Sequence, residues 1–122
     1  LNGKIKFGMW SATSIPTASW TTIADFTLPA GLYMIMASVN VASVSAPNAI
    51  MGIRLLNNGG AESQKIENYI SNQESGMSFF TFVNLTKSTS TAAVQFFHNT
   101  GQSIYVGRRH VCVIPVSNTD LI

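Results

Sequence analysis

Hydrophobic and polar residues alternate with a period of two along most of this chain. The alternating segments are enriched in β-branched and aromatic residues, and the breaks between them are rich in Gly, Pro, Asn and Ser. An extended strand points successive side chains to opposite faces, so this pattern is typical of strands and not of helices. The sequence therefore predicts a nearly all-β domain of about eight to ten short strands.

The expected strands lie where the alternation is clearest. They are residues 4–10, 19–26, 32–44, 50–56, 77–85, 92–98 and 104–116, with one short strand around 66–70. Asn57-Asn58-Gly59-Gly60 tolerates the positive φ of a tight hairpin turn, and the polar residues 57–76 are expected to form mainly a long loop. Because the sequence shows no internal repeat, a sandwich or barrel is the expected architecture.

Two expected strands carry more aromatic bulk than one small core can hold. Phe79, Phe80 and Phe82 lie on the first, and Phe96 and Phe97 lie on the second. The outer face of a sandwich sheet normally meets water, so we expect one outer face to be covered by a neighbouring copy. Our candidate interface residues are Phe80, Phe82, Phe97 and Tyr105, and the pattern leaves open which phenylalanines face the core.

The length and the charge of the chain limit the number of domains and the kinds of partner that we expect. A chain of 122 residues fits a single β-sandwich domain over residues 1–122. Charged residues make up only 10% of the chain, and its net charge of +2 comes from scattered cations, so nucleic acid is not an expected partner. No apolar run reaches the roughly 18 residues of a membrane span, so we expect no membrane insertion.

Cys112 and the two histidines are the side chains that could react as a thiol or bind a metal. The lone Cys112 lies in an apolar run and is expected to be a buried, reduced thiol. His110 lies two residues away and points to the same face, an arrangement that could hold a metal on a symmetry axis. Because no further ligand has useful spacing, we expect no metal and no cofactor. His98 is expected at the surface or in an interface.

No strongly specific catalytic motif is present, so we do not expect an enzyme. A glycan hydrolase needs two carboxylates facing across a cleft, and Glu62, Glu67 and Glu74 are the candidates that could in principle converge. Carboxylates in a polar loop are more often solubilising. Hydrolysis is therefore the third and least favoured function.

The long polar segment 57–76 is the expected binding region, because recognition concentrates on long loops held by a rigid scaffold. Tyr69 offers a stacking ring for a neutral sugar, and the same segment could be an ordinary polar loop. The hydrogen-bonding candidates around the ring are Lys65, Asn68, Asn72, Gln73 and Glu74. Trp10 and Trp20 could also stack on sugars, but tryptophan on a strand is usually packed, so both are expected in the core.

Three segments resemble one known family. They are Phe26-Thr27-Leu28-Pro29-Ala30-Gly31-Leu32-Tyr33, the stretch from Ser78 to Leu85, and Tyr105-Val106-Gly107 before the closing apolar strand. Their order is similar to that of the trimeric jelly roll shared by tumour necrosis factor and the globular heads of complement. The resemblance implies an antiparallel jelly-roll sandwich and a homotrimer. Thr86-Lys87-Ser88-Thr89 departs from the family's frequent Gly-Asp, so the local turn is expected to differ.

Within that fold, the low-charge, Ser/Thr/Asn-rich, cysteine-poor composition resembles the tips of bacteriophage tail fibres and neck appendages. The resemblance implies a virion protein whose trimer recognises a host-surface glycan or protein receptor. The missing initiator Met suggests the C-terminal fragment of a longer fibrous protein. The alternative is a structural trimerisation or capping domain, including an intramolecular chaperone, without a ligand of its own.

Overall fold

The computed structural model describes residues 6–46, 48–58, 60–70 and 73–116, and these contain seven strands and no helix. The strands are β1 (Lys6–Trp10), β2 (Thr13–Ile15), β3 (Thr21–Val41), β4 (Ile50–Asn57), β5 (Ala61–Tyr69), β6 (Ser75–His98) and β7 (Ile104–Val116). Every strand pairing is antiparallel. The predicted all-β class is therefore confirmed. Asn72, Gly59 and the first two residues of the expected strand 4–10 lie outside the described residues.

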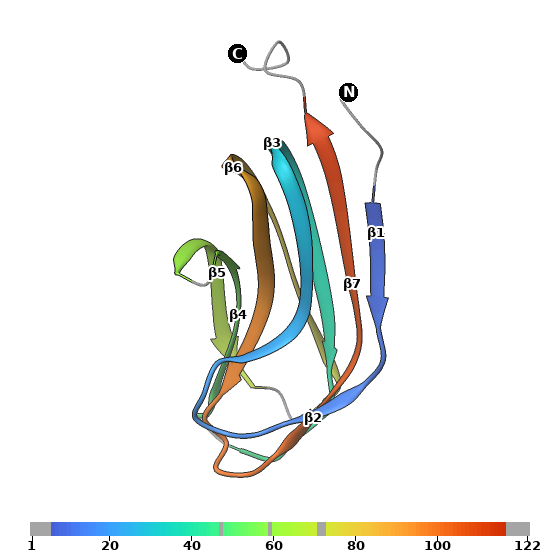
Figure 1. The fold of residues 1–122 in the computed structure, drawn as a ribbon. Helices are drawn as coiled ribbons and strands as arrows, with labels where there is room; N and C mark the ends of the chain where they lie inside the picture. The colour runs from blue at the N-terminus through green and yellow to red at the C-terminus, as the bar shows by residue number, and fades with distance from the viewer. Residues whose placement is uncertain (1–5, 47, 59, 71–72, 117–122) are drawn as a thin grey trace.

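There are fewer strands than expected because two of them are very long. β3 joins the expected strands 19–26 and 32–44, and β6 joins 77–85 and 92–98. β3 and β6 pair with each other along nearly their whole length, with two register shifts, one between Thr22 and Ala24 and the other between Pro29 and Gly31. The two strands turn over together at one end of the molecule (Figure 1). A continuous paired ribbon therefore stands where the sequence suggested separate strands and loops.

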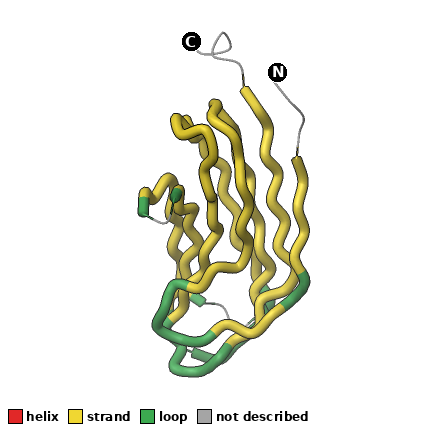
Figure 2. Tube along the Cα trace, viewed as in Figure 1, coloured by secondary structure: helices red, strands yellow, loops and turns green. Residues whose placement is uncertain are grey.

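Folding this ribbon over produces two layers. The first layer contains β1, β7 and the halves of β3 and β6 at residues 31–41 and 75–85, with β2 paired to β7. The second layer contains the other halves of the ribbon, residues 21–29 and 89–98, followed by β4 and β5. This arrangement is the jelly-roll sandwich that the sequence predicted, and strands account for most of the described chain (Figure 2).

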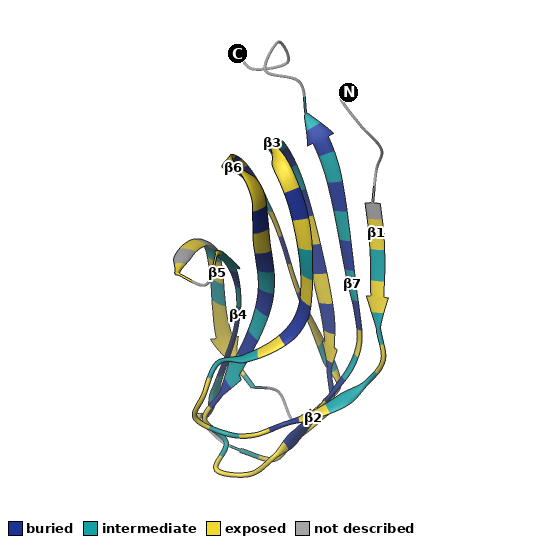
Figure 3. Cartoon of the chain, viewed as in Figure 1, coloured by how far each residue is buried: buried dark blue, intermediate teal, exposed yellow. Residues whose placement is uncertain are grey.

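The hydrophobic core lies between the two layers. Alternate residues along the long strands are buried and exposed, as the banding in Figure 3 shows. Ile35, Ile53, Leu55 and Phe96 are completely buried at its centre. The alternation in the expected strand 32–44 places five residues on one face, and all five are buried: Tyr33, Ile35, Ala37, Val39 and Val41. Burial of this apolar area is the main source of stability in such a domain.

The turn of the ribbon is fastened by a side chain. The Tyr33 hydroxyl donates a hydrogen bond to the Pro29 carbonyl oxygen at 2.8 Å, across the register shift. Gly31, between them, has φ +156°, and a Cβ there would lie 3.3 Å from the tyrosine hydroxyl. On the partner strand, residues 86–89 continue β6 without a separate turn.

The polar segment 57–76 is only partly a loop, which corrects the expectation from sequence. The tight turn is confirmed, because Asn57 pairs with Ala61 and Asn58 has φ 51°. The chain then continues as the nine-residue strand β5, paired to β4. β5 lies at the end of the strand order, where one edge and one face meet solvent. Its many polar side chains are compatible with a strand for that reason.

His98 is fully buried, so its expected surface position is wrong. Its Nε2 lies 2.9 Å from the Ile15 carbonyl oxygen, and its Nδ1 lies 3.0 Å from the Thr100 hydroxyl. A carbonyl can only accept a hydrogen bond, so Nε2 carries a proton. The ring thus connects β6 to β2 at one end of the sandwich. A strand-end histidine gives no sequence signal that distinguishes this role from a surface position.

Arg109 is a second buried polar residue, and no pattern in the sequence predicts its burial. Its Nε donates to the Ile23 carbonyl oxygen at 2.9 Å, and its Nη1 donates to the carbonyl oxygens of Ser11 and Gly107. Burial lowers the pKa of this guanidinium from its usual value, because the charge loses hydration. The side chain joins β7 in the first layer to β3 in the second.

Candidate functional site

The outer face of the first layer is apolar. Phe80, Met36, Cys112 and Phe7 are register neighbours on four adjacent strands and form one row across the sheet. The next row contains Phe82, Met34 and Ile114. The exposed fractions of the side chains at Phe7, Phe80 and Phe82 are 68%, 60% and 56%. We call these two rows the apolar face.

A shallow hollow of about 580 Å³ lies along this part of the molecule. Its lining includes Phe7, Met36, Phe80 and Cys112 from the apolar face, together with His110 and Ile66. Exposed apolar area of this extent is unusual on a monomer and is typical of an interaction surface.

Cys112 lies in the apolar face and is only partly buried, so the expectation of a fully buried thiol is wrong. Its neighbours in the sequence point to the core, but Cys112 itself has the opposite parity on β7. His110 shares its face as predicted, and its ring lies 5.9 Å from that of Phe7. The described residues contain no group of three or more His, Cys, Asp or Glu side chains placed to hold a metal.

The structure separates the four candidate interface residues. Phe80 and Phe82 are adjacent on the apolar face, with ring centroids 6.5 Å apart in an edge-to-face arrangement. Phe97 lies in the second layer, and Tyr105 lies on β7 beside β2. Tyr105 is 55% exposed, but it is several residues along β7 from Cys112 and the apolar face.

The outer face of the second layer carries an aromatic pair. The ring of Trp20 lies 5.5 Å from that of Phe97, and the Arg54 guanidinium carbon lies 4.2 Å from the Trp20 ring centroid. Gly52 makes room for the indole, since a Cβ there would lie 2.9 Å from a ring carbon. Trp20 is half-buried on this outer face, so its expected place in the core is wrong. Trp10 does pack against the core, as expected.

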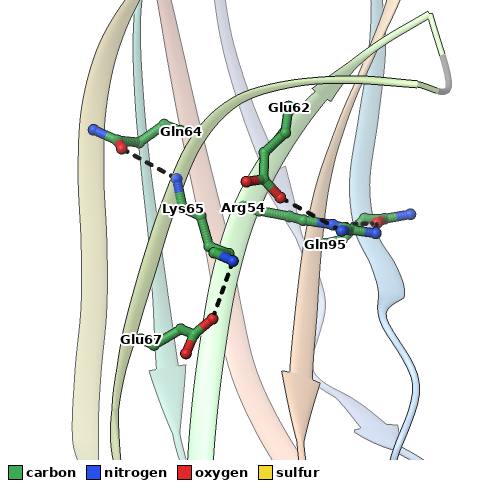
Figure 4. Close-up of polar contacts among 6 residues, drawn as sticks. All are labelled: Arg54, Glu62, Gln64, Lys65, Glu67 and Gln95. Carbon is green, nitrogen blue, oxygen red and sulfur yellow. Dashed lines mark hydrogen bonds and ion pairs between the residues drawn. The ribbon is translucent and has the colours of Figure 1, made fainter.

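A chain of hydrogen bonds crosses the second layer beside this pair. The Nε and Nη2 atoms of Arg54 both donate to Gln95 Oε1, at 2.9 and 2.7 Å. Gln95 Nε2 then donates to the Thr22 hydroxyl at 3.2 Å, and Arg54 Nη1 lies 3.5 Å from Glu62 Oε2. Figure 4 shows the Arg54 side chain reaching toward Gln95 with Glu62 beside it. We call Trp20, Phe97, Arg54, Gln95, Thr22 and Glu62 the mixed face.

The candidate ligand residues of segment 57–76 do not form one cluster. Lys65 and Tyr69 lie on β5 with the parity that points outward from the second layer, and Tyr69 is 69% exposed. Asn68 Oδ1 accepts a hydrogen bond from the backbone N–H of Tyr69 at 2.8 Å. Gln73 is exposed, and Glu74 accepts a hydrogen bond from Asn40 of β3.

The three glutamates that could have converged have different partners. Glu62 is paired with Arg54, Glu67 with Lys65 at 3.3 Å, and Glu74 with Asn40. Each is solvent-exposed. The structure therefore assigns each of them an interaction at the surface of the domain.

Comparison with known proteins gives structural neighbours only. No protein-family model matches the sequence, and no curated protein matches it. Several solved structures share the jelly-roll architecture. The VP2 subviral particle of infectious bursal disease virus matches with a TM-score of 0.66 and 9% sequence identity. The match covers 96% of this chain and 34% of the VP2 chain. This chain thus spans about a third of the length of VP2.

Two further neighbours are similar in size to this chain. The globular domain of zebrafish complement 1qA protein has a TM-score of 0.54 and 10% identity, covering 88% of this chain and 98% of its own. A disulfide-linked pilus protein of Bacillus endospore appendages matches with a TM-score of 0.51 and 13% sequence identity. The match covers 96% of this chain and 95% of the pilus protein chain. At these identities the likeness establishes the fold. The chain is thus a jelly-roll module, similar in fold to complement heads as the sequence implied.

Among the described residues, no helix is long and apolar enough to cross a membrane.

Proposed function

We propose that this domain is the homotrimeric receptor-binding tip of a viral or phage fibre, and that it recognises a host-surface glycan or protein. The observation that carries the proposal is the contrast between the two outer faces of the sandwich. One is an exposed apolar surface suited to self-association, and the other is a polar surface with embedded aromatic rings.

Self-association is supported by the apolar face. Phe7, Phe80 and Phe82 are each more than half exposed and lie in two adjacent rows. Covering such rings removes apolar area from water, which is the main favourable contribution to protein association. A second copy of this chain offers a matching apolar surface, and the family resemblance noted in the sequence implies threefold symmetry.

Recognition is supported by the second layer. If the first layer is covered by neighbouring copies, the mixed face lies on the opposite side of each sandwich and stays open to solvent. Every chain of the trimer would then present one copy of it. A virion or other extracellular location fits such a presentation, because the recognised receptor lies on a host surface.

The rival function is a trimerisation cap without a ligand, and it requires the apolar face alone. The mixed face favours recognition over the cap, because a solvated outer face has no need of a half-buried Trp stacked on Arg54. A glycan hydrolase is the least favoured function, since Glu62 and Glu67 each form an ion pair with a neighbouring cation.

Sedimentation and adsorption together test the proposal. We expect the purified domain to sediment as a trimer and, when fluorescently labelled, to adsorb to a subset of a panel of bacterial strains. A trimer that adsorbs to none of them would support the cap. A domain that remains monomeric at high concentration would overturn the proposal.

A further inference from the structure

We infer that the mixed face is a binding site for a neutral glycan, with the Trp20–Phe97 pair as its apolar platform and Arg54, Gln95 and Glu62 as its polar groups. This inference rests on the proposed function and names the surface and the ligand class. It differs from the expectation for segment 57–76, because the central residues lie outside that segment: Trp20 directly precedes β3, Arg54 lies on β4 and Gln95 lies on β6.

The aromatic pair is held in a fixed position. Trp20 lies over Gly52, where the absent Cβ lets the indole approach the sheet. Arg54 stacks on the indole at 4.2 Å, and Phe97 lies beside it at 5.5 Å. Both rings remain partly exposed. A sugar presents C–H groups on one side of its ring, and an aromatic surface held in place binds such a side with little loss of side-chain entropy.

The polar groups are also ordered before a ligand arrives. Two donors of Arg54 fix Gln95, Gln95 donates to Thr22, and Glu62 lies beside the remaining Arg54 nitrogen. Guanidinium, amide, hydroxyl and carboxylate groups can exchange hydrogen bonds with sugar hydroxyls, which both donate and accept. Because the network already has a defined geometry, recognition costs little reorganisation.

Charge identifies the ligand as neutral. Arg54 is paired with Glu62 at 3.5 Å, and the adjacent Lys65 is paired with Glu67 at 3.3 Å. Each cation on this part of the described surface is therefore matched by a carboxylate. These carboxylates would repel an anionic glycan or a nucleic acid, whereas they do not repel a neutral glycan.

Tyr69 extends the same surface. It lies on β5 two residues beyond Glu67, with the same outward parity, and β5 is the strand next to β4. A glycan longer than one or two sugars could therefore reach from Trp20 toward Tyr69. This position would explain why segment 57–76 carried a binding signal in the sequence although the centre of the site lies elsewhere.

A glycan array followed by matched variants tests the inference on the intact assembly. We expect the wild-type domain to bind neutral oligosaccharides in preference to sialylated or sulfated ones. For the strongest neutral oligosaccharide, Arg54→Met should weaken binding by roughly tenfold or more, while Lys87→Met, at an exposed cation of the ribbon turn, should leave it unchanged.

Tryptophan fluorescence supplies a readout that does not depend on loss of binding. Trp10→Phe leaves Trp20 as the only indole, and its emission should change on titration with the oligosaccharide. Trp20→Phe leaves Trp10, whose emission should not change. Melting curves of all four variants identify any variant that fails to fold.

Four outcomes are distinguishable. Neutral-glycan binding with the expected variant pattern supports the inference. The inference is overturned if Arg54→Met does not weaken glycan binding and the fluorescence of Trp10 changes on titration. It is also overturned if only anionic glycans bind. Either of these results leaves the proposed function standing. Adsorption to cells without any glycan binding indicates a protein receptor and also overturns it. Neither adsorption nor glycan binding would overturn both.

Discussion

Individual polar residues inside this sandwich connect its two layers. Arg109 reaches from β7 to the Ile23 carbonyl oxygen of β3, and His98 reaches from β6 to the Ile15 carbonyl oxygen of β2. Both side chains lie within the hydrophobic interior, where an unpaired carbonyl oxygen is costly. Replacing either side chain would therefore leave a carbonyl oxygen of another strand without its hydrogen-bond donor and should lower the stability of the domain.

Arg109→Met should destabilise the domain by about 2–3 kcal/mol, because the buried Ile23 carbonyl oxygen and the partly buried interaction with the Ser11 carbonyl oxygen would lose their donor. Urea unfolding followed by circular dichroism measures the change. Arg108→Met is the matched control, since the neighbouring Arg108 is exposed, and we expect its effect to be within about 0.5 kcal/mol. Equal midpoints for the two variants would contradict the structural role of Arg109.

At the scale of elements, the defining feature is the paired ribbon of β3 and β6. Its two strands stay paired on either side of the register shift at Pro29 and Gly31, and so they can turn over as a unit. This turn carries the chain from the second layer to the first. The hydrogen bond from Tyr33 to Pro29 spans it and fixes its geometry.

Tyr33→Phe should lower the free energy of unfolding by about 1 kcal/mol, because the ring stays buried but the Pro29 carbonyl oxygen loses its donor. Tyr105→Phe is the control, because Tyr105 is 55% exposed and water can replace its hydroxyl interactions. Chemical denaturation of both variants is the measurement. A loss in Tyr105→Phe as large as in Tyr33→Phe would argue against a special role for the turn.

At the scale of the whole molecule, the two outer faces divide the proposed functions between them. The first layer exposes the apolar face, and the second layer exposes the mixed face. Assembly through one leaves the other free. Two predictions follow from the trimer proposed above, one for its stability and one for the accessibility of Cys112.

Phe82→Asp should convert the trimer to monomers, because it would place a desolvated charge in each interface, at a cost of about 3 kcal/mol or more. Analytical ultracentrifugation measures the assembly state. Tyr69→Asp is the control, because Tyr69 is 69% exposed but belongs to the second layer, and this variant should remain trimeric. A trimer that persists in Phe82→Asp would place the interface elsewhere.

Labelling of Cys112 with a maleimide should report the same assembly. Cys112 lies between Phe7 and Met36 in the apolar face, so neighbouring copies would cover it although a single chain does not bury it fully. We expect slow labelling of the trimer and fast labelling of folded Phe82→Asp monomers. If labelling is equally fast in both, the thiol is accessible in the assembly and the apolar face is not the interface.

The alternation of residues was sufficient to predict the all-β class, the buried face of residues 32–44 and the tight turn at Asn57 and Asn58, because strand periodicity and turn chemistry are local properties. Phe80 and Phe82 share a face for the same local reason, because they lie two residues apart on one strand. Parity alone does not determine whether the side chains of Cys112 and Trp20 lie in the core or on an outer face. That depends on which layer covers which face.

Only the tertiary structure decided where the candidate site lies. Trp20 directly precedes β3, whereas Arg54 and Gln95 lie on β4 and β6. They meet because the folded ribbon brings 21–29 and 89–98 beside β4. Nothing in the local sequence around any of them indicates the other two. The burial of His98 and Arg109 has the same origin, since each side chain is hydrogen-bonded to a carbonyl oxygen more than 80 residues away in the chain. Side-chain parity is determined locally, whereas the partner that each face meets is determined by the fold.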